Sequence, residues 1–172
     1  GDEPYYIEEL IVGRTYVLEE TVAPDGYLQA QEITFTVPES GEIQTVIMKD
    51  ENAMGKISIS KLEAGEEEIF LSDTVFETRA AEDIITPEGT VRLKKGELAD
   101  TITTEGEAAQ SRELFLGKYT VKEVKQTPGY VLDDREYEAS LTYKDQHTAL
   151  VTENLEIFNE PTKLHICKKD AG

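Results

Sequence analysis

Short segments in which apolar and polar residues alternate follow one another along almost the whole chain. Alternation with a period of two predicts β-strands that bury one face, and Gly- and Pro-containing turns separate the segments. We expect strands over residues 14–22, 32–37, 45–49, 56–62, 119–125, 137–143 and 150–158. Short helical turns fit only residues 79–84 and 105–114. Many short strands joined by tight turns predict an all-β antiparallel sandwich.

The charge balance narrows the classes of partner. Asp and Glu total 36 against 17 Lys and Arg, which gives a net charge of −19. Such a surface repels polyanions, so we expect no nucleic acid and no membrane as partner. The acidic pair Asp133–Asp134 lacks the spacing of a calcium loop and is interpreted as solvated surface. No apolar run reaches membrane-spanning length, and any targeting or anchoring signal is expected outside this stretch.

Cys167 is the only cysteine, so no disulfide can form within the chain. In an extracellular protein without disulfides, another kind of covalent cross-link can take their place. The alternative is a protein of a reducing compartment with an ordinary free thiol.

The chain contains two internal repeats. Tyr16–Tyr27 resembles Tyr119–Tyr130, with a Glu four residues after the first Tyr in both, and Lys56–Lys61 resembles Lys163–Lys168. The order of these motifs predicts three parts. Residues 1–52 form the C-terminal part of a preceding module, residues 53–161 a complete module, and residues 162–172 the first strand of a following module.

Three polar residues end three apolar stripes. Because alternate residues of a strand share a face, each lies on the face that its neighbours bury. The stripes are Ile57, Ile59 and Lys61; Tyr119, Val121 and Glu123; and Leu155, Ile157 and Asn159.

Burial disfavours the charged form of an ionisable group. A buried Lys61 becomes a neutral, nucleophilic amine, and a buried Glu123 becomes an acid that can shuttle protons. The amine can then attack the carboxamide of Asn159 and expel ammonia. The alternative is that all three side chains reach solvent at the strand ends.

The first repeat also resembles a known motif. Residues Tyr16, Leu18, Glu20, Thr21, Ala23, Pro24, Gly26 and Tyr27 match the E-box of sortase-assembled pilins. Residues 55–160 resemble the collagen-adhesin B-type domain, also called the SpaA-like prealbumin fold, an immunoglobulin-like β-sandwich of Gram-positive pilins and adhesins. The second E-box departs from the motif at Val121, Val124 and Gln126, and its proline is one place late, at Pro128.

The resemblance implies an intramolecular isopeptide bond between a first-strand Lys and a last-strand Asn or Asp, with the E-box Glu as catalyst. Carried over by position, the amine is Lys61, the acceptor Asn159 and the proton shuttle Glu123. No cofactor and no metal are implied.

The first part of the chain holds an incomplete version of the same set. Glu20 is the equivalent glutamate, and either Asp50 or Asn52 is the acceptor, but no Lys precedes Lys49. Lys168 is the expected donor of a third module. Strand exchange between the chain ends would bring Lys168 to another copy's acceptor; the alternative is that both ends are loosely packed.

The resemblance implies a structural stalk or spacer module at the cell wall of a Gram-positive bacterium, with neighbouring modules as its partners. The alternative is an adhesin module that binds a host ligand, an extracellular-matrix protein or a glycan, through an insertion at residues 74–112. The chain contains no nucleophile elbow and no zinc-protease motif. We therefore expect no enzyme activity beyond a single-turnover bond formation.

Overall fold

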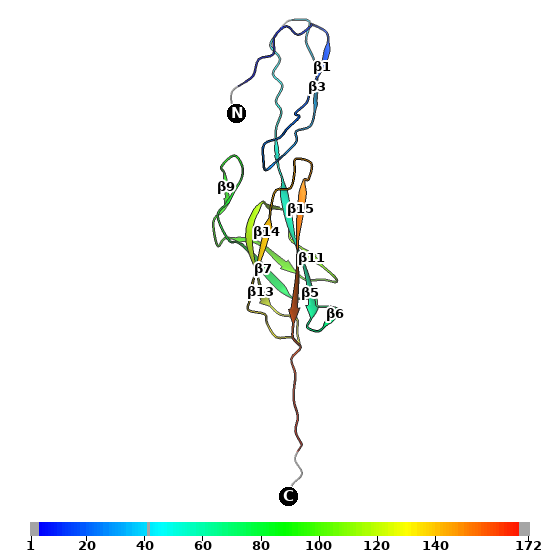
Figure 1. Cartoon of the computed structure of the whole chain (residues 1–172), viewed down its shortest axis with the longest axis vertical. Coiled ribbons are helices and arrows are strands. Elements are labelled where there is room, and N and C mark those ends of the chain that lie inside the picture. Colours follow the sequence, from blue (N-terminus) through cyan, green and yellow to red (C-terminus); the bar gives the residue numbers. More distant parts are fainter. Residues whose placement is uncertain (1–3, 41, 169–172) are drawn as a thin grey trace.

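In the computed structural model, residues 4–40 and 42–168 are described, and within those ranges the chain is built of strands and turns without a helix (Figure 1). No helix in the described residues is therefore long and apolar enough to cross a membrane. The strands are β1 (Thr15–Leu18), β2 (Tyr27–Leu28), β3 (Ile33–Thr36), β4 (Glu51–Asn52), β5 (Met54–Glu63), β6 (Glu66–Phe70), β7 (Val75–Ala80), β8 (Ile84–Ile85), β9 (Val91–Leu93), β10 (Leu98–Thr103), β11 (Ala109–Gln110), β12 (Leu114–Phe115), β13 (Gly117–Lys125), β14 (Glu136–Leu141) and β15 (Leu150–Asn159). The predicted all-β fold is confirmed.

Two sheets form the sandwich in the middle of the molecule. One has the order β10-β7-β13-β14 with antiparallel pairs throughout. The other is built around β5, which pairs with β6, β11, β12 and β15. Apolar side chains from both sheets fill the space between them, and those of Ile57, Ile59, Phe76, Val121 and Ile157 are fully buried.

One strand pair departs from the antiparallel prediction. β15 runs parallel to β5 over its full length, with Ile157 opposite Lys61. A hairpin cannot join parallel neighbours, because the chain must cross over before it returns in the same direction. Here the whole chain between β5 and β15 forms the crossover. The sequence did not predict the parallel pair, because the alternation of apolar residues carries no information about strand direction.

The first part of the chain forms a small extension beyond one end of the sandwich (Figure 1). β1 pairs with β3, with Tyr16 stacked on Phe35, and β2 pairs with β4. The strand predicted over residues 45–49 is wrong, since these residues lie in no strand. A strand needs a neighbouring backbone to accept its hydrogen bonds, and the alternating pattern cannot supply one.

Two further predictions are corrected. Neither helical turn forms, because Arg79 and Ala80 belong to β7 while residues 105–114 contain β11 and the start of β12. Residues 74–112 are also not an insertion: β7 and β10 within them are adjacent strands of the four-stranded sheet. The excursion that carries β8 and β9 projects from the sandwich (Figure 1).

The chain leaves the sandwich after β15. Residues 163–168 form no strand and lie exposed as a tail at the end opposite the N-terminal part (Figure 1). The predicted first strand of a following module falls on this tail and on residues 169–172, which lie outside the described residues, as do residues 1–3.

Candidate functional site

Three strands bring Lys61, Glu123 and Asn159 to one place between the sheets. β5 and β15 are parallel neighbours in one sheet, so Lys61 and Asn159 lie at the same end of that sheet. Glu123 comes from β13 in the facing sheet, where it lies opposite Phe76. All three residues fall near the C-terminal ends of their strands. The site therefore joins the first and last strands of the sandwich to its opposite layer.

The site is dry. Lys61 and Glu123 are each 1% exposed, and Asn159 is 2% exposed. The alternative interpretation from the sequence, that these side chains reach solvent at the strand ends, is not what the structure has. The alternation of apolar residues identified the buried face on each of the three strands.

The three side chains contact one another. The Lys61 Nζ donates to Asn159 Oδ1 at 2.6 Å and forms an ion pair with Glu123 Oε2 at 2.9 Å. The Asn159 Nδ2 donates to both carboxylate oxygens of Glu123, at 2.9 Å to Oε1 and 3.1 Å to Oε2. Each of the three groups thus satisfies the others' hydrogen-bonding capacity.

Burial lowers the pKa of the Lys61 amine, because removing the ammonium from water disfavours its charged form. The hydrogen bond and charge of Glu123 oppose this shift but do not cancel it. The ring of Phe76 lies 5.6 Å from Nζ and covers it further. The amine is consequently easier to deprotonate than a lysine in water.

The geometry provides the parts of an amide exchange. One oxygen, Glu123 Oε2, contacts both the lysine nitrogen and the carboxamide nitrogen of Asn159. A carboxylate in this position can accept a proton from the amine and return it to the departing nitrogen. The amine already touches the carboxamide it would attack, so little positional entropy remains to be lost.

A second polar cluster lies on the loop that precedes β14. Asp133 accepts hydrogen bonds from Arg135 Nε and Nη2, both at 2.8 Å, and from the Tyr137 hydroxyl at 2.5 Å. The Asp133 side chain retains only 7% exposure, so its interpretation as solvated surface is wrong. The Arg135 guanidinium holds the pKa of the Asp133 carboxyl well below its ordinary value. The alternate spacing of Asp133, Arg135 and Tyr137 was the available signal.

The other predicted site residues are not brought together. Glu20 is half-buried, and its Oε2 accepts the amide of Ala30 at 2.8 Å. Asp50 and Lys168 are both exposed, and no lysine forms an ion pair or hydrogen bond with Glu20 within residues 4–40 and 42–168. The ranges described also contain no group of His, Cys, Asp or Glu side chains that could hold a metal ion.

The two repeats use the same backbone register after the E-box. Tyr27 pairs with Asn52, and Tyr130 pairs with Pro161. The carbonyl of Gly26 accepts the amide of Ala53, and that of Gly129 accepts the amide of Thr162. Asn52 is therefore the structural counterpart of Pro161. Two residues earlier along the chain in each repeat, the counterpart of Asn159 is Asp50.

Comparison with protein families gives a match over most of the chain. The model of a family described as SpaA, prealbumin-like fold domain, matches residues 3–52 and 55–156. No curated protein matches the chain in sequence.

Solved structures resemble the chain as well. The Bacillus anthracis TIE protein superimposes with a TM-score of 0.59 at 19% identity, over 86% of this chain and 25% of that one. The T6 backbone pilin of serotype M6 Streptococcus pyogenes gives 0.48 at 13% identity, over 77% and 36%. Domains D2 and D3 of the major pilin SpaD from Corynebacterium diphtheriae give 0.45 at 19%, over 76% and 52%. The chain thus spans about half or less of each protein, and the first likeness supports the fold.

Proposed function

The chain belongs to the family of SpaA prealbumin-like fold domains, and from this membership we propose that it is a structural stalk module of a Gram-positive surface or pilus protein, stapled by an isopeptide bond between Lys61 and Asn159. The observation that carries the proposal is the buried contact of an amine, a carboxylate and a carboxamide. Chance seldom assembles these groups in a core, since each is costly to bury alone.

The reaction is an amide exchange. Glu123 takes a proton from the Lys61 ammonium, and the neutral amine attacks Cγ of Asn159. A bond forms between Nζ and Cγ, the bond between Cγ and Nδ2 breaks, and a proton passes from the attacking nitrogen through Glu123 to Nδ2, which leaves as ammonia. The carboxyl of Glu123 keeps the proton that the ammonium first lost. The product is a neutral amide beside a neutral acid, which a dry core accommodates better than an ion pair.

The bond would close a loop whose ends lie 98 residues apart in sequence. By analogy with a disulfide that closes a loop of this size, it restricts the unfolded chain and stabilises the fold by roughly 4–5 kcal/mol. It also ties β5 to β15, so that the sandwich cannot be opened from its two chain ends. A cross-link in this position suits a protein exposed to proteases and to tension.

The wider setting follows from the family and the repeats. Two of the similar structures are described as pilins. We place this chain at the Gram-positive cell surface, with neighbouring modules of the same protein as its partners. Residues 1–52 then belong to a preceding module, 53–161 form the complete one, and 162–172 begin the next.

The register of the repeats supports Asp50 as the acceptor of the preceding module. With Asp50 as the counterpart of Asn159, Met48 takes the place of the buried Ile157 and Val46 that of Leu155. With Asn52 instead, the charge of Asp50 would occupy the core position of Ile157. The lysine for this bond would come from a first strand of the preceding module.

Intact mass tests the proposal. We expect the purified chain to be lighter than its sequence by one ammonia, and Glu123→Gln to restore the full mass while keeping the shape of the side chain. Glu136→Gln, on the exposed surface of β14, is the matched control and should keep the ammonia loss. Asn159→Asp should instead lose one water. A wild-type chain of full mass, or a Glu123→Gln chain that still lacks ammonia, would refute the bond.

A further inference from the structure

The turn that follows the first E-box glutamate lies against the complete module. Gly26 has a positive φ of +91°, and a Cβ placed on it would come within 2.5 Å of Pro87 Cγ. Pro87 belongs to the excursion between β8 and β9. Only glycine fits here, because the backbone conformation and the approach of Pro87 both exclude a side chain. The Tyr27 hydroxyl adds a hydrogen bond to Glu88 at 3.0 Å.

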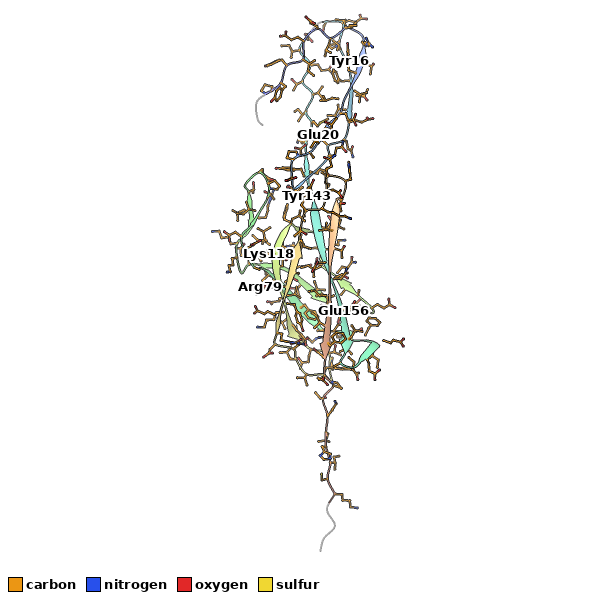
Figure 2. The ribbon with its side chains drawn as sticks, viewed as in Figure 1. Tyr16, Glu20, Arg79, Lys118, Tyr143 and Glu156 are labelled. Carbon is orange, nitrogen blue, oxygen red and sulfur yellow. The ribbon has the colours of Figure 1, made fainter. Side chains whose placement is uncertain are left out.

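The loop between β14 and β15 holds the other side of this turn. The Gln146 side chain accepts the amide of Ala23 at 2.8 Å and donates to the carbonyl of Thr21 at 3.3 Å. Its backbone carbonyl accepts the amide of Gln29 at 3.0 Å. Tyr143 donates to the carbonyl of Tyr27, and Figure 2 shows it at the end of the sandwich that faces the N-terminal part. Each of these hydrogen bonds involves a backbone group of the turn, so together they fix the position of the turn relative to the sandwich.

The counterpart turn in the second repeat has the same shape and no such neighbour. Gly129 has a φ of +92°, and a Cβ there would meet nothing within 4 Å. The amides of Gln126 and Leu132, counterparts of Ala23 and Gln29, make no hydrogen bond to any residue in the described ranges. Ala23 is buried, whereas Gln126 is exposed.

Apolar side chains surround the vacant turn. Val124 is 45% exposed, Val131 53% and Leu132 43%. Together with Gln126 and Gly129, they form what we call the distal turn surface. It lies next to the place where the chain leaves the sandwich, because Gly129 pairs with Thr162.

We propose that the E-box turn is the docking element between consecutive modules, and that the distal turn surface receives a following module of the same kind. The partner presents the equivalents of Pro87 and Gln146, as the complete module does to Gly26. The E-box glycine then has two roles: it forms the turn, and its lack of a side chain lets the proline of the next module pack against it. The proposal depends on the repeat and on the observed junction, and it holds whether or not Lys61 is cross-linked.

One contact differs between the two turns. The Tyr130 hydroxyl donates to Glu63 of its own module at 2.6 Å, whereas Tyr27 reaches Glu88 across the junction. Docking at the distal turn surface therefore uses Gly129 and the backbone amides. Tyr130 does not reach the partner, because its hydroxyl is bonded within its own module.

The existing junction is tested in the full chain by distance measurement between two spin labels. Labels at Val17→Cys and Lys118→Cys, in a Cys167→Ser background, lie on exposed positions on either side of it. We expect a narrow distance distribution that becomes wider in Gln146→Ala and in Pro87→Ala. Gln110→Ala, an exposed glutamine on β11, is the matched control and should leave it narrow. A distribution already broad in the parent chain, or unchanged in both variants, would overturn the docking role.

The distal turn surface is tested in a tandem chain in which residue 161 is followed by a second copy of residues 53–168. The equivalence of Pro161 with Asn52 sets this splice point. With labels at Lys118→Cys of both copies, and Cys167→Ser in the second, we expect a narrow distribution that Gly129→Ala of the first copy or Pro87→Ala of the second makes wider. Gly129→Ala in the single chain controls for backbone strain and should leave the Val17–Lys118 distribution narrow. A broad tandem distribution, or one that neither variant changes, would refute the surface.

Discussion

A buried lysine is the side chain on which the chemistry of this core depends. Lys61 and Glu123 form an ion pair without any exposed side-chain surface. Moving two ions out of water costs several kcal/mol each, and removing one partner of a buried pair typically costs 3–5 kcal/mol. Asn159 accepts from the amine and donates to the carboxylate, which lowers the cost without removing the charges. The proposed amide formation would remove them, so the same contacts that place the groups would also favour their reaction.

Asp133 should make the stability of the fold depend on acid. Its folded-state pKa lies below the ordinary 3.8, chiefly through the hydrogen bonds from Arg135. A carboxyl with a lowered folded pKa stabilises the protein above its unfolded pKa, and this contribution is lost as the pH falls through the folded value. Asp133→Asn should lower the free energy of unfolding by roughly 1.5–3 kcal/mol at neutral pH, the usual contribution of a hydrogen bond to a charged group.

Thermal unfolding as a function of pH checks this prediction. The difference in melting temperature between the parent chain and Asp133→Asn should shrink steadily as the pH is lowered below about 4. Asp134→Asn changes the neighbouring, exposed carboxyl and serves as the control. A constant difference from neutral to acid pH would contradict the assigned role of the Asp133 carboxylate.

The sequence could predict which way the site residues face, and it could not predict all of their surroundings. Each of Lys61, Glu123 and Asn159 ends an apolar stripe, and alternation alone puts it on the buried face. Their meeting depends on the parallel pairing of β5 with β15 and on the layer opposite, which are tertiary properties. The burial of Asp133 was not predicted, because a pair of adjacent acidic residues is usually solvated. The hydrogen bond from Arg135 compensates for the burial of its charge.

Strands formed where the folded chain supplied neighbours for them. β5 reaches from Met54 to Glu63, longer than the expected 56–62, because β15 accompanies it from end to end. The segment expected over residues 14–22 is reduced to β1, which has only β3 beside it. The periodic pattern identifies strand-forming segments, but backbone pairing determines how much of each becomes a strand.

The register of the last strand yields a prediction about Asp50. A peptide with the sequence of β5, Met54–Glu63, supplies a first strand with a lysine in the position of Lys61. We expect it to join the chain covalently at Asp50, with the loss of one water. Asp50→Asn should give an adduct that has lost ammonia instead, Glu20→Gln should give none, and Asn52→Ala should react as the parent does.

Mass spectrometry of the digested adduct identifies the modified residue. Attachment at Asn52, or no adduct with the parent chain, would count against the register. Asn52 lines the cavity of about 320 Å³ between the N-terminal part and the sandwich, alongside Gly26 and Pro87. That location suits a residue of the junction better than an acceptor in a module core.

The path of a pulling force through the protein follows from the order of its parts along the long axis. The N-terminal part lies beyond one end of the sandwich and the tail leaves from the other (Figure 1). β5 starts beside the junction and runs to the far end, where Lys61 meets Asn159. With the bond formed, the covalent route from junction to tail is β5, the cross-link and the start of the tail. The chain between residues 62 and 158 lies outside this route and carries no load.

Single-molecule stretching between the two chain ends tests this load path. The parent chain should show no extension step from the complete module, because β5 is already extended along the pulling direction. Glu123→Gln leaves the chain uncross-linked and should release the chain between Lys61 and Asn159, whose sequence separation is 98, in one step. At about 3.4 Å per residue that step is roughly 330 Å, less the distance spanned in the fold. Glu136→Gln should behave as the parent. A step of this length in the parent chain would mean that the load passes through the strands, and that the module resists force by its hydrogen bonds alone.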